Sequence, residues 1–178
     1  MKNSSSAVII RAELKSDFDA IRKLNKKAFK GKNESKLIDA VRESSCFIPA
    51  LSMVAVKDGV VVGHILFTPV RIKSPQTAVP ALALAPMSVL PELQNRGIGT
   101  ALVKKGLEES VKSGHKIVVV VGHPEYYPRF GFVAAGGKGL KLPFEAPEEV
   151  FMVLELARNA LKDVSGEIEY PKAFHDIN

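Results

Sequence analysis

The chain has 178 residues, of which 46% are hydrophobic and 25% are charged, with one cysteine and a net charge of +6. This length suits one domain, and the composition excludes disordered chains and collagen-like repeats. The single cysteine, Cys46, cannot form an internal disulfide or build a zinc site alone, so we expect an inert thiol. No apolar stretch approaches the roughly 20 residues that a membrane helix needs. We therefore expect one cytoplasmic domain over residues 1–178, without a membrane partner.

The first half of the sequence predicts a strand, two helices and a hairpin. Apolar residues at helical spacing follow a candidate N-cap, Ser16, and a second segment repeats this spacing. Asp58-Gly59 lies between two β-rich runs and is typical of a tight hairpin turn. A loop containing Pro75 is expected at 74–79. Strands are predicted at 8–14, 51–56 and 60–72, and helices at 15–29 and 34–44.

Proline and glycine residues divide the second half more clearly. Pro86 lies within an apolar run and cannot donate a ladder hydrogen bond, so we expect the strand to bulge or open there. The five apolar residues 117–121 predict a central strand covered on both faces. Gly114 is expected to end the helix before it. Further strands are predicted at 81–89, 133–135 and 150–156, a helix at 97–112, a turn with a short helix at 124–132, and a strand or surface segment at 166–174.

This order of elements predicts an α/β fold. The early hairpin is antiparallel, whereas the later strand–helix–strand unit is parallel, so the sheet must be mixed. Helices are expected on both of its faces.

The most informative segment leads from a buried strand into the helix at 97–112. Gly97 and Gly99 let the backbone approach a ligand closely. The first N–H groups of a helix are unpaired and carry the positive end of its dipole, so they can bind phosphate, with Arg96 as a charged donor beside them. Leu102 replaces the third small residue of the dinucleotide fingerprint. From spacing alone, an anion site and a plain glycine-rich turn both remain open.

Three ordered blocks of the sequence match a known family. Gln94-x-x-Gly97-x-Gly99 resembles the pyrophosphate-binding motif of the GNAT superfamily of acetyl-CoA-dependent N-acetyltransferases. Residues 84–92 resemble the strand before that motif, and residues 120–132 resemble the later strand with its Tyr-Tyr-x-x-x-Gly-Phe turn. The combination is most similar to the YhbS-like branch of predicted acetyltransferases. The resemblance implies the GNAT acyl-CoA N-acyltransferase fold, with its core at about residues 50–135.

The resemblance also implies a site for acetyl-CoA as cosubstrate. In the superfamily, two parallel strands splay apart and the pantetheine arm bonds to the open strand edge. Here the backbone of Met87 and Val89 is expected at that edge, with Ser88 near the acetyl carbonyl. Lys104 and Lys105 are candidates for the 3′-phosphate, although a solvent-facing position is the simpler interpretation. The pyrophosphate is expected on the backbone N–H groups of Gln94, Asn95, Arg96, Gly97, Ile98, Gly99 and Thr100.

Catalysis in this superfamily is direct transfer, in which a deprotonated amine attacks the thioester carbonyl and the thiolate leaves. Tyr127 stands four residues before Gly131, at the position that serves as general acid in many relatives. A tyrosine hydroxyl has a pKa of about 10, near that of a thiol, and so suits protonation of the leaving sulfur. A packing tyrosine with a satisfied hydroxyl is the structural alternative.

The acceptor side is less well defined by the sequence. Residues 81–87 lack the acid that some relatives carry on this strand, so the general base is Glu34, His123, His64 or a water chain. A histidine has a suitable unperturbed pKa. We expect Glu34, His123 and Tyr126 to contact the acceptor and assign none of them as base. No Cys/His cluster has zinc spacing, so no metal is expected.

Two other functions remain open. A non-catalytic module would bind acyl-CoA in the same site, as a sensor or structural element. The basic middle of the chain suits a nucleic-acid binder, but no basic stripe is interleaved with aromatic residues, so we expect no nucleic-acid partner. The acceptor is undefined: a small metabolite, a polyamine, an aminoglycoside, a peptide N-terminus and a protein lysine all fit. A homodimer is possible, because dimers are the commonest symmetric assembly.

Overall fold

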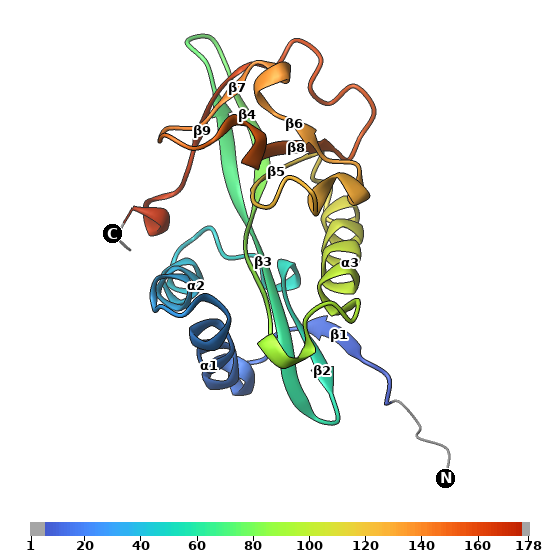
Figure 1. Ribbon diagram of the computed structural model, residues 1–178. Coiled ribbons are helices and arrows are strands. Elements are labelled where there is room, and N and C mark those ends of the chain that lie inside the picture. Colours follow the sequence, from blue (N-terminus) through green and yellow to red (C-terminus); the bar gives the residue numbers. More distant parts are fainter. Residues whose placement is uncertain (1–5, 176–178) are drawn as a thin grey trace.

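A nine-stranded mixed sheet runs through the structure (Figure 1). The computed structural model describes residues 6–175 of the chain. The strands are β1 Ile9–Ala12, β2 Ser52–Lys57, β3 Val60–Lys73, β4 Ala78–Val89, β5 Ile117–Val121, β6 Val133–Ala134, β7 Leu140–Lys141, β8 Phe151–Glu155 and β9 Gly166–Glu169.

The strand pairing confirms the mixed sheet that the sequence predicts. β1, β2, β3 and β4 pair antiparallel in chain order, and β5 then joins β4 in parallel. β8 lies antiparallel to β5, and β6 lies antiparallel to β8. β9 pairs with the end of β3 and with β7, a two-residue strand that the sequence did not indicate. The last strands therefore extend the sheet beside the far end of the β3–β4 hairpin.

Helices cover both faces of the sheet, as predicted. α1 Phe18–Phe29 and α2 Asn33–Glu43 lie on one face, and α3 Ile98–Lys112 lies on the other (Figure 1). Ile21 and Val41 are fully buried against the first face, in a cluster with Leu66 of β3. On the opposite face, a Cβ on Gly106 of α3 would overlap the Phe67 ring, so glycine permits the close helix–sheet approach. Within residues 6–175, no helix is both long and apolar enough to cross a membrane.

The entry into α1 differs from the prediction. Ser16 is not the N-cap, because the chain enters the helix through a 3₁₀ turn at Lys15–Asp17. The Asp17 carboxylate accepts the Leu14 N–H at 2.7 Å and also pairs with Arg11 at 2.7 Å. The Asp17 carboxylate, one residue after Ser16, thus accepts the backbone N–H at the start of this turn.

The β3–β4 hairpin is longer than the sequence indicates. The loop predicted at 74–79 ends earlier, because Ser74 N–H donates to the Thr77 carbonyl at 2.9 Å and closes a tight turn. β4 then begins at Ala78. Arg71 and Lys73 of β3 also pair with β9, so β3 connects the N-terminal strands with the last strand of the chain.

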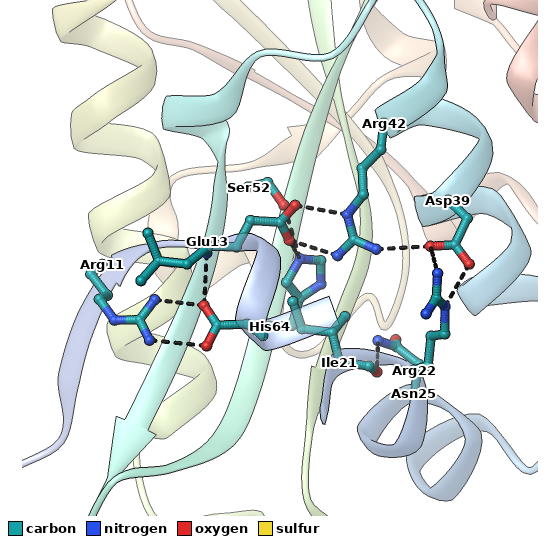
Figure 2. A network of polar contacts seen from close by, with 11 residues as sticks. Arg11, Glu13, Ile21, Arg22, Asn25, Asp39, Arg42, Ser52 and His64 are labelled. Atoms are coloured by element: carbon teal, nitrogen blue, oxygen red, sulfur yellow. Dashed lines mark hydrogen bonds and ion pairs between the residues drawn. The ribbon is translucent and has the colours of Figure 1, made fainter. Parts of the chain in front are cut away.

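A buried ion-pair network fastens α2 to the sheet (Figure 2). The Glu13 carboxylate, just after β1, accepts two hydrogen bonds at 2.8 Å from the Arg42 guanidinium near the end of α2. Nε2 of His64 on β3 lies 3.2 Å from the same carboxylate and 3.0 Å from the Ser52 hydroxyl. Arg42 also donates to Asp39 at 2.8 Å. The network therefore connects three strands with the helix that borders the site described below.

Burial and pairing fix the charges in this network. Burial alone would raise the pKa of Glu13, but hydrogen bonds from Arg42 and His64 outweigh it and lower the pKa to about 2. Burial lowers the pKa of His64, so its imidazole is neutral near pH 7. The Glu13 carboxylate therefore balances the Arg42 charge.

Candidate active site

β4 and β5 pair over a short distance and then separate. Leu82 pairs with Val118 and Ala83 pairs with Val119, after which β4 continues to Val89 with β3 as its partner. Within residues 6–175, the β5-facing edge of residues 84–89 therefore has no strand partner. Its N–H and C=O groups can accept an extended ligand as a strand would.

Pro86 lies at the point of separation, as the sequence predicts. β3 pairs Ile65 with Met87 and Phe67 with Leu84, so three steps along β4 match two along β3. This irregularity is a bulge, which bends a strand and interrupts its ladder. The missing N–H of proline thus falls where the regular pairing is broken.

A cleft of about 1670 Å³ opens where the two strands part. β4, the glycine-rich segment, the segment after β5, the α1–α2 junction and the C-terminal segment contribute to its lining. All but two of the predicted cofactor residues line it, namely Met87, Ser88, Val89, Gln94, Asn95, Gly97, Gly99 and Thr100.

The other predicted cofactor residues lie outside the lining. The Arg96 side chain is exposed, and the side chain of Ile98, the first residue of α3, packs in the core. Their predicted contribution is the backbone N–H, and both stand at the start of α3. Lys104 and Lys105 also lie outside the lining, and Lys105 pairs with Glu109 at 3.2 Å.

The segment before α3 has the backbone geometry of a ligand cradle. Gly97 has a φ of +83°, and a Cβ there would meet no atom within 4 Å. Asn95 also has positive φ, at 60°. The Gln94 side-chain amide donates to the Val89 carbonyl at 3.2 Å, which holds the segment against the end of β4. The unpaired N–H groups of the first turn of α3 are therefore held beside the cleft.

Tyr127 begins a 3₁₀ turn, Tyr127–Phe130, shortly after β5, and it lines the cleft. Its ring packs edge-on against Tyr126 at 5.1 Å and Phe132 at 5.5 Å between ring centroids. A Cβ on Gly122 would overlap the Tyr127 ring, so only glycine leaves room for this position. Burial, with a smaller effect of Tyr126, raises the pKa of the Tyr127 hydroxyl, which is therefore protonated near pH 7.

Two buried hydroxyls in the cleft have no hydrogen-bond partner among the described residues. They belong to Ser88 on β4 and to Tyr126. The Tyr126 oxygen lies 2.9 Å from the position that a Cβ on Gly99 would occupy, so it borders the first turn of α3. Buried hydroxyls are normally paired. Both are therefore suited to hydrogen bonds with a ligand.

The structure separates the candidates for the acceptor side. Glu34, at the start of α2, and His123, just after β5, both line the cleft. His64 does not, because it is fully buried in the network with Glu13. Across residues 6–175, no three His, Cys, Asp or Glu side chains cluster as a metal site would require.

The structure also brings four aromatic residues to the cleft that sequence reasoning did not assign to it. They are Phe29, Phe144, Tyr170 and Phe174. They come from three separate segments of the chain, because Tyr170 and Phe174 are only four residues apart, and no local spacing could have shown that the three segments meet.

Comparison with known proteins decides the family. The acetyltransferase (GNAT) domain family matches residues 9–135, which is more than half of the chain. The chain belongs to the GNAT acetyltransferase family. The N-acetyltransferase YjhQ of Escherichia coli is 40% identical over 136 residues, covering 76% of this chain and 75% of YjhQ. YhbS of the same organism is 32% identical over 169 residues, covering 94% of this chain and 99% of YhbS.

Solved structures confirm the GNAT fold that the resemblance implied. The crystal structure of YhbS from Escherichia coli in complex with CoA has a TM-score of 0.90 at 30% identity, covering 98% of this chain and 96% of that one. A GNAT acetyltransferase from Brucella melitensis in complex with acetyl-CoA has a TM-score of 0.77 at 31% identity, covering 95% and 99%.

Proposed function

We propose that this GNAT protein transfers the acetyl group of acetyl-CoA directly to a primary amine, with Tyr127 as general acid. The observation that carries the proposal is the cleft between the separated β4 and β5, which joins an open strand edge, a helix N-terminus and a buried tyrosine. Two similar structures hold CoA or acetyl-CoA, which supports the same ligand here.

The cleft fits the parts of acetyl-CoA in order. The backbone of Met87 and Val89 on the open edge of β4 bonds to the amide groups of the pantetheine arm. The N–H groups of residues 94–100 bind the pyrophosphate at the start of α3, where the helix dipole favours negative charge. The free hydroxyl of Ser88 supplies a further hydrogen bond near the acetyl group. The free Tyr126 hydroxyl, which we expected on the acceptor side, borders the first turn of α3, so we propose it as a cofactor contact instead.

The transfer forms a C–N bond and breaks the C–S bond of the thioester. The Tyr127 hydroxyl gives its proton to the leaving sulfur, which departs as the CoA thiol. Burial raises the pKa of Tyr127 and keeps its hydroxyl protonated near pH 7, so the residue has a proton to give. Glu34 and His123 line the cleft and are our candidates to contact the acceptor. The bound ammonium first loses one proton to solvent water, because only the neutral amine attacks. As the amide forms, the nitrogen gives up a second proton, which restores the Tyr127 hydroxyl.

The test is release of CoA thiol from acetyl-CoA in the presence of a panel of primary amines. Tyr127→Phe should lower kcat by roughly 10²–10⁴-fold, the usual range for loss of a general acid, while CoA affinity is kept. Tyr126→Phe is the comparison variant: it removes the neighbouring hydroxyl, which we assign to ligand binding, and should raise KM more than it lowers kcat. Unchanged turnover in Tyr127→Phe would contradict the acid role. CoA binding without turnover with any amine would instead indicate a non-catalytic CoA-binding module.

A further inference from the structure

Three aromatic rings form a continuous surface at one part of the cleft. The Phe144 and Tyr170 ring centroids lie 6.0 Å apart at 35°, and the Tyr170 and Phe174 centroids lie 5.0 Å apart at 38°. We call these three residues the aromatic wall. Phe144 follows β7, Tyr170 follows β9, and Phe174 ends the 3₁₀ turn Lys172–Phe174. All three line the cleft.

The aromatic wall is not simply part of the hydrophobic core. The Phe144 side chain is 51% exposed, and Tyr170 and Phe174 are half-buried. Phe29, at the end of α1, adds another ring to the lining and is 40% exposed. Exposed aromatic rings that gather in one cleft can pair with an aromatic ring of a ligand, face to face or edge to face. Such pairs contribute binding energy beyond that of the apolar area they bury.

The wall lies on the α2 side of the molecule. Phe174 packs with the buried cluster that contains Leu37 and Ile38 of α2, and the C-terminal turn lies beside this helix in Figure 1. Glu34, one turn before Ile38, carries a carboxylate into the same lining. Within the described residues, Glu34 forms no ion pair. An unpaired anion therefore stands in the same cleft as the aromatic wall.

Exposed lysines flank the stretch of chain that brings Phe29 and Glu34 to the cleft, although none of these lysines lines it. Five exposed lysines follow one another along the end of α1, the connecting loop and the start of α2, and none has an ion-pair partner within residues 6–175. Their field repels a molecule with several positive charges more strongly than one with a single charge. They are Lys26, Lys27, Lys30, Lys32 and Lys36.

We infer that the acceptor is a primary monoamine that carries an aromatic ring, with the ring on the aromatic wall and the ammonium group at Glu34. This inference rests on the proposed function and narrows its acceptor. The ammonium loses one proton to solvent water, and the neutral nitrogen then bonds to the acetyl carbon as the C–S bond breaks. Tyr127 protonates the leaving sulfur, and the second proton of the nitrogen restores the Tyr127 hydroxyl. Polyamines and aminoglycosides are disfavoured because they carry no aromatic ring for the wall and several positive charges near the exposed lysines.

The first experiment compares three amines with the wild-type protein and acetyl-CoA. 2-Phenylethylamine and 2-cyclohexylethylamine have the same chain and a ring of similar size, but only the first has a π face. We expect kcat/KM to be up to about tenfold higher for the phenyl compound, as an aromatic pair supplies, and lowest for spermidine. Equal values for both rings, or a preference for spermidine, would overturn the inference while leaving N-acetyl transfer intact.

The second experiment changes the wall. Phe144→Leu removes the most exposed ring and should bring the phenyl-to-cyclohexyl ratio close to one, whereas Phe144→Tyr keeps a ring and should keep the ratio. Tyr170→Leu is a second variant with the same expectation. CoA affinity, measured by calorimetry, should be unchanged in all three and shows that each variant is folded. A ratio that survives both leucine substitutions would contradict the role of the wall.

A direct binding measurement separates this inference from the proposed function. Saturation-transfer NMR detects 2-phenylethylamine on the CoA-bound protein whether or not transfer occurs. Binding that weakens in Phe144→Leu supports the aromatic site even if no amine is acetylated, a result that would count against the proposed function alone. Absence of binding by the wild-type protein would overturn the inference.

Discussion

The position of Tyr127 depends on a residue without a side chain. A Cβ on Gly122 would fall within the Tyr127 ring, so any larger residue must displace the ring or the backbone after β5. A misplacement of about 1 Å at a reacting group can cost 10²-fold in rate. The hydroxyl that we propose as general acid is therefore placed by packing, with no hydrogen bond needed to hold it.

This leads to a prediction for Gly122→Ala. The substitution should lower kcat by roughly tenfold or more while the affinity for CoA changes little, as measured by steady-state kinetics and calorimetry. Gly137→Ala is the matched control, because a Cβ there would meet no atom within 4 Å. Full activity in Gly122→Ala would mean that the ring position has no part in the reaction.

Among the helices, α2 is held to the sheet by a buried ion pair. Arg42 has a side chain only 7% exposed and meets Glu13, which is 3% exposed, through two hydrogen bonds. Removal of one partner from a buried pair leaves the other charge unpaired, which typically costs 3–5 kcal/mol. Because α2 also carries Glu34 to the cleft, this ion pair helps to position Glu34 in the cleft lining.

Arg42→Met should lower the free energy of unfolding by about 3–5 kcal/mol in urea denaturation. Arg22→Met is the control: Arg22 also pairs with Asp39, but its side chain is 48% exposed. Exposed pairs contribute about 0–1 kcal/mol, so this variant should stay close to wild type. Equal losses in the two variants would show that burial does not decide the strength of the pairs.

At the scale of the whole molecule, the network makes stability depend on pH. Unfolded His64 takes up a proton below its ordinary pKa of 6.5, whereas burial lowers this pKa in the folded protein. Unfolded Glu13 takes up a proton below 4.5, whereas the folded carboxylate does so at about 2. In both cases the unfolded state binds more protons in acid, so stability is lost as the pH falls.

The free energy of unfolding should therefore decline below about pH 6.5 and more steeply between about pH 4.5 and 2. The Glu13 shift corresponds to about 3 kcal/mol at most. Urea titrations at a series of pH values measure this decline. Glu13→Gln should flatten the part below pH 4.5, and an unchanged slope in this variant would show that other carboxylates cause the acid sensitivity.

The sequence predicts those parts of the fold that depend on neighbours along the chain. Pro86 marks the bulge in β4, Gly97 precedes α3 with positive φ, and Asp58-Gly59 forms the hairpin turn. The acetyltransferase assignment follows from blocks of this kind, in which each motif lies within a single strand–turn–helix unit.

The parts that the sequence did not predict depend on residues far apart in the chain. Glu13 meets Arg42 across 29 positions and His64 across 51, and no periodicity connects them. The aromatic wall joins Phe144 with the distant C-terminal pair Tyr170 and Phe174, and nothing in the sequence connects these two segments. Individual glycines such as Gly122 give no hint of the ring they accommodate. These features depend on tertiary packing between distant residues, which cannot be predicted from local patterns in one sequence.

The central claim is that the cleft between β4 and β5 binds acetyl-CoA with its pyrophosphate at the start of α3. The most direct test is calorimetric titration of CoA and acetyl-CoA into wild type, Gly97→Glu and Gly97→Gln. Both variants place a side chain of similar size in the open space beside Gly97 and impose the same strain at positive φ, but only glutamate adds negative charge. We predict micromolar binding by wild type, about −8 kcal/mol, clear weakening in Gly97→Gln and loss in Gly97→Glu. No binding by folded wild type, or equal binding by all three proteins, would contradict the account.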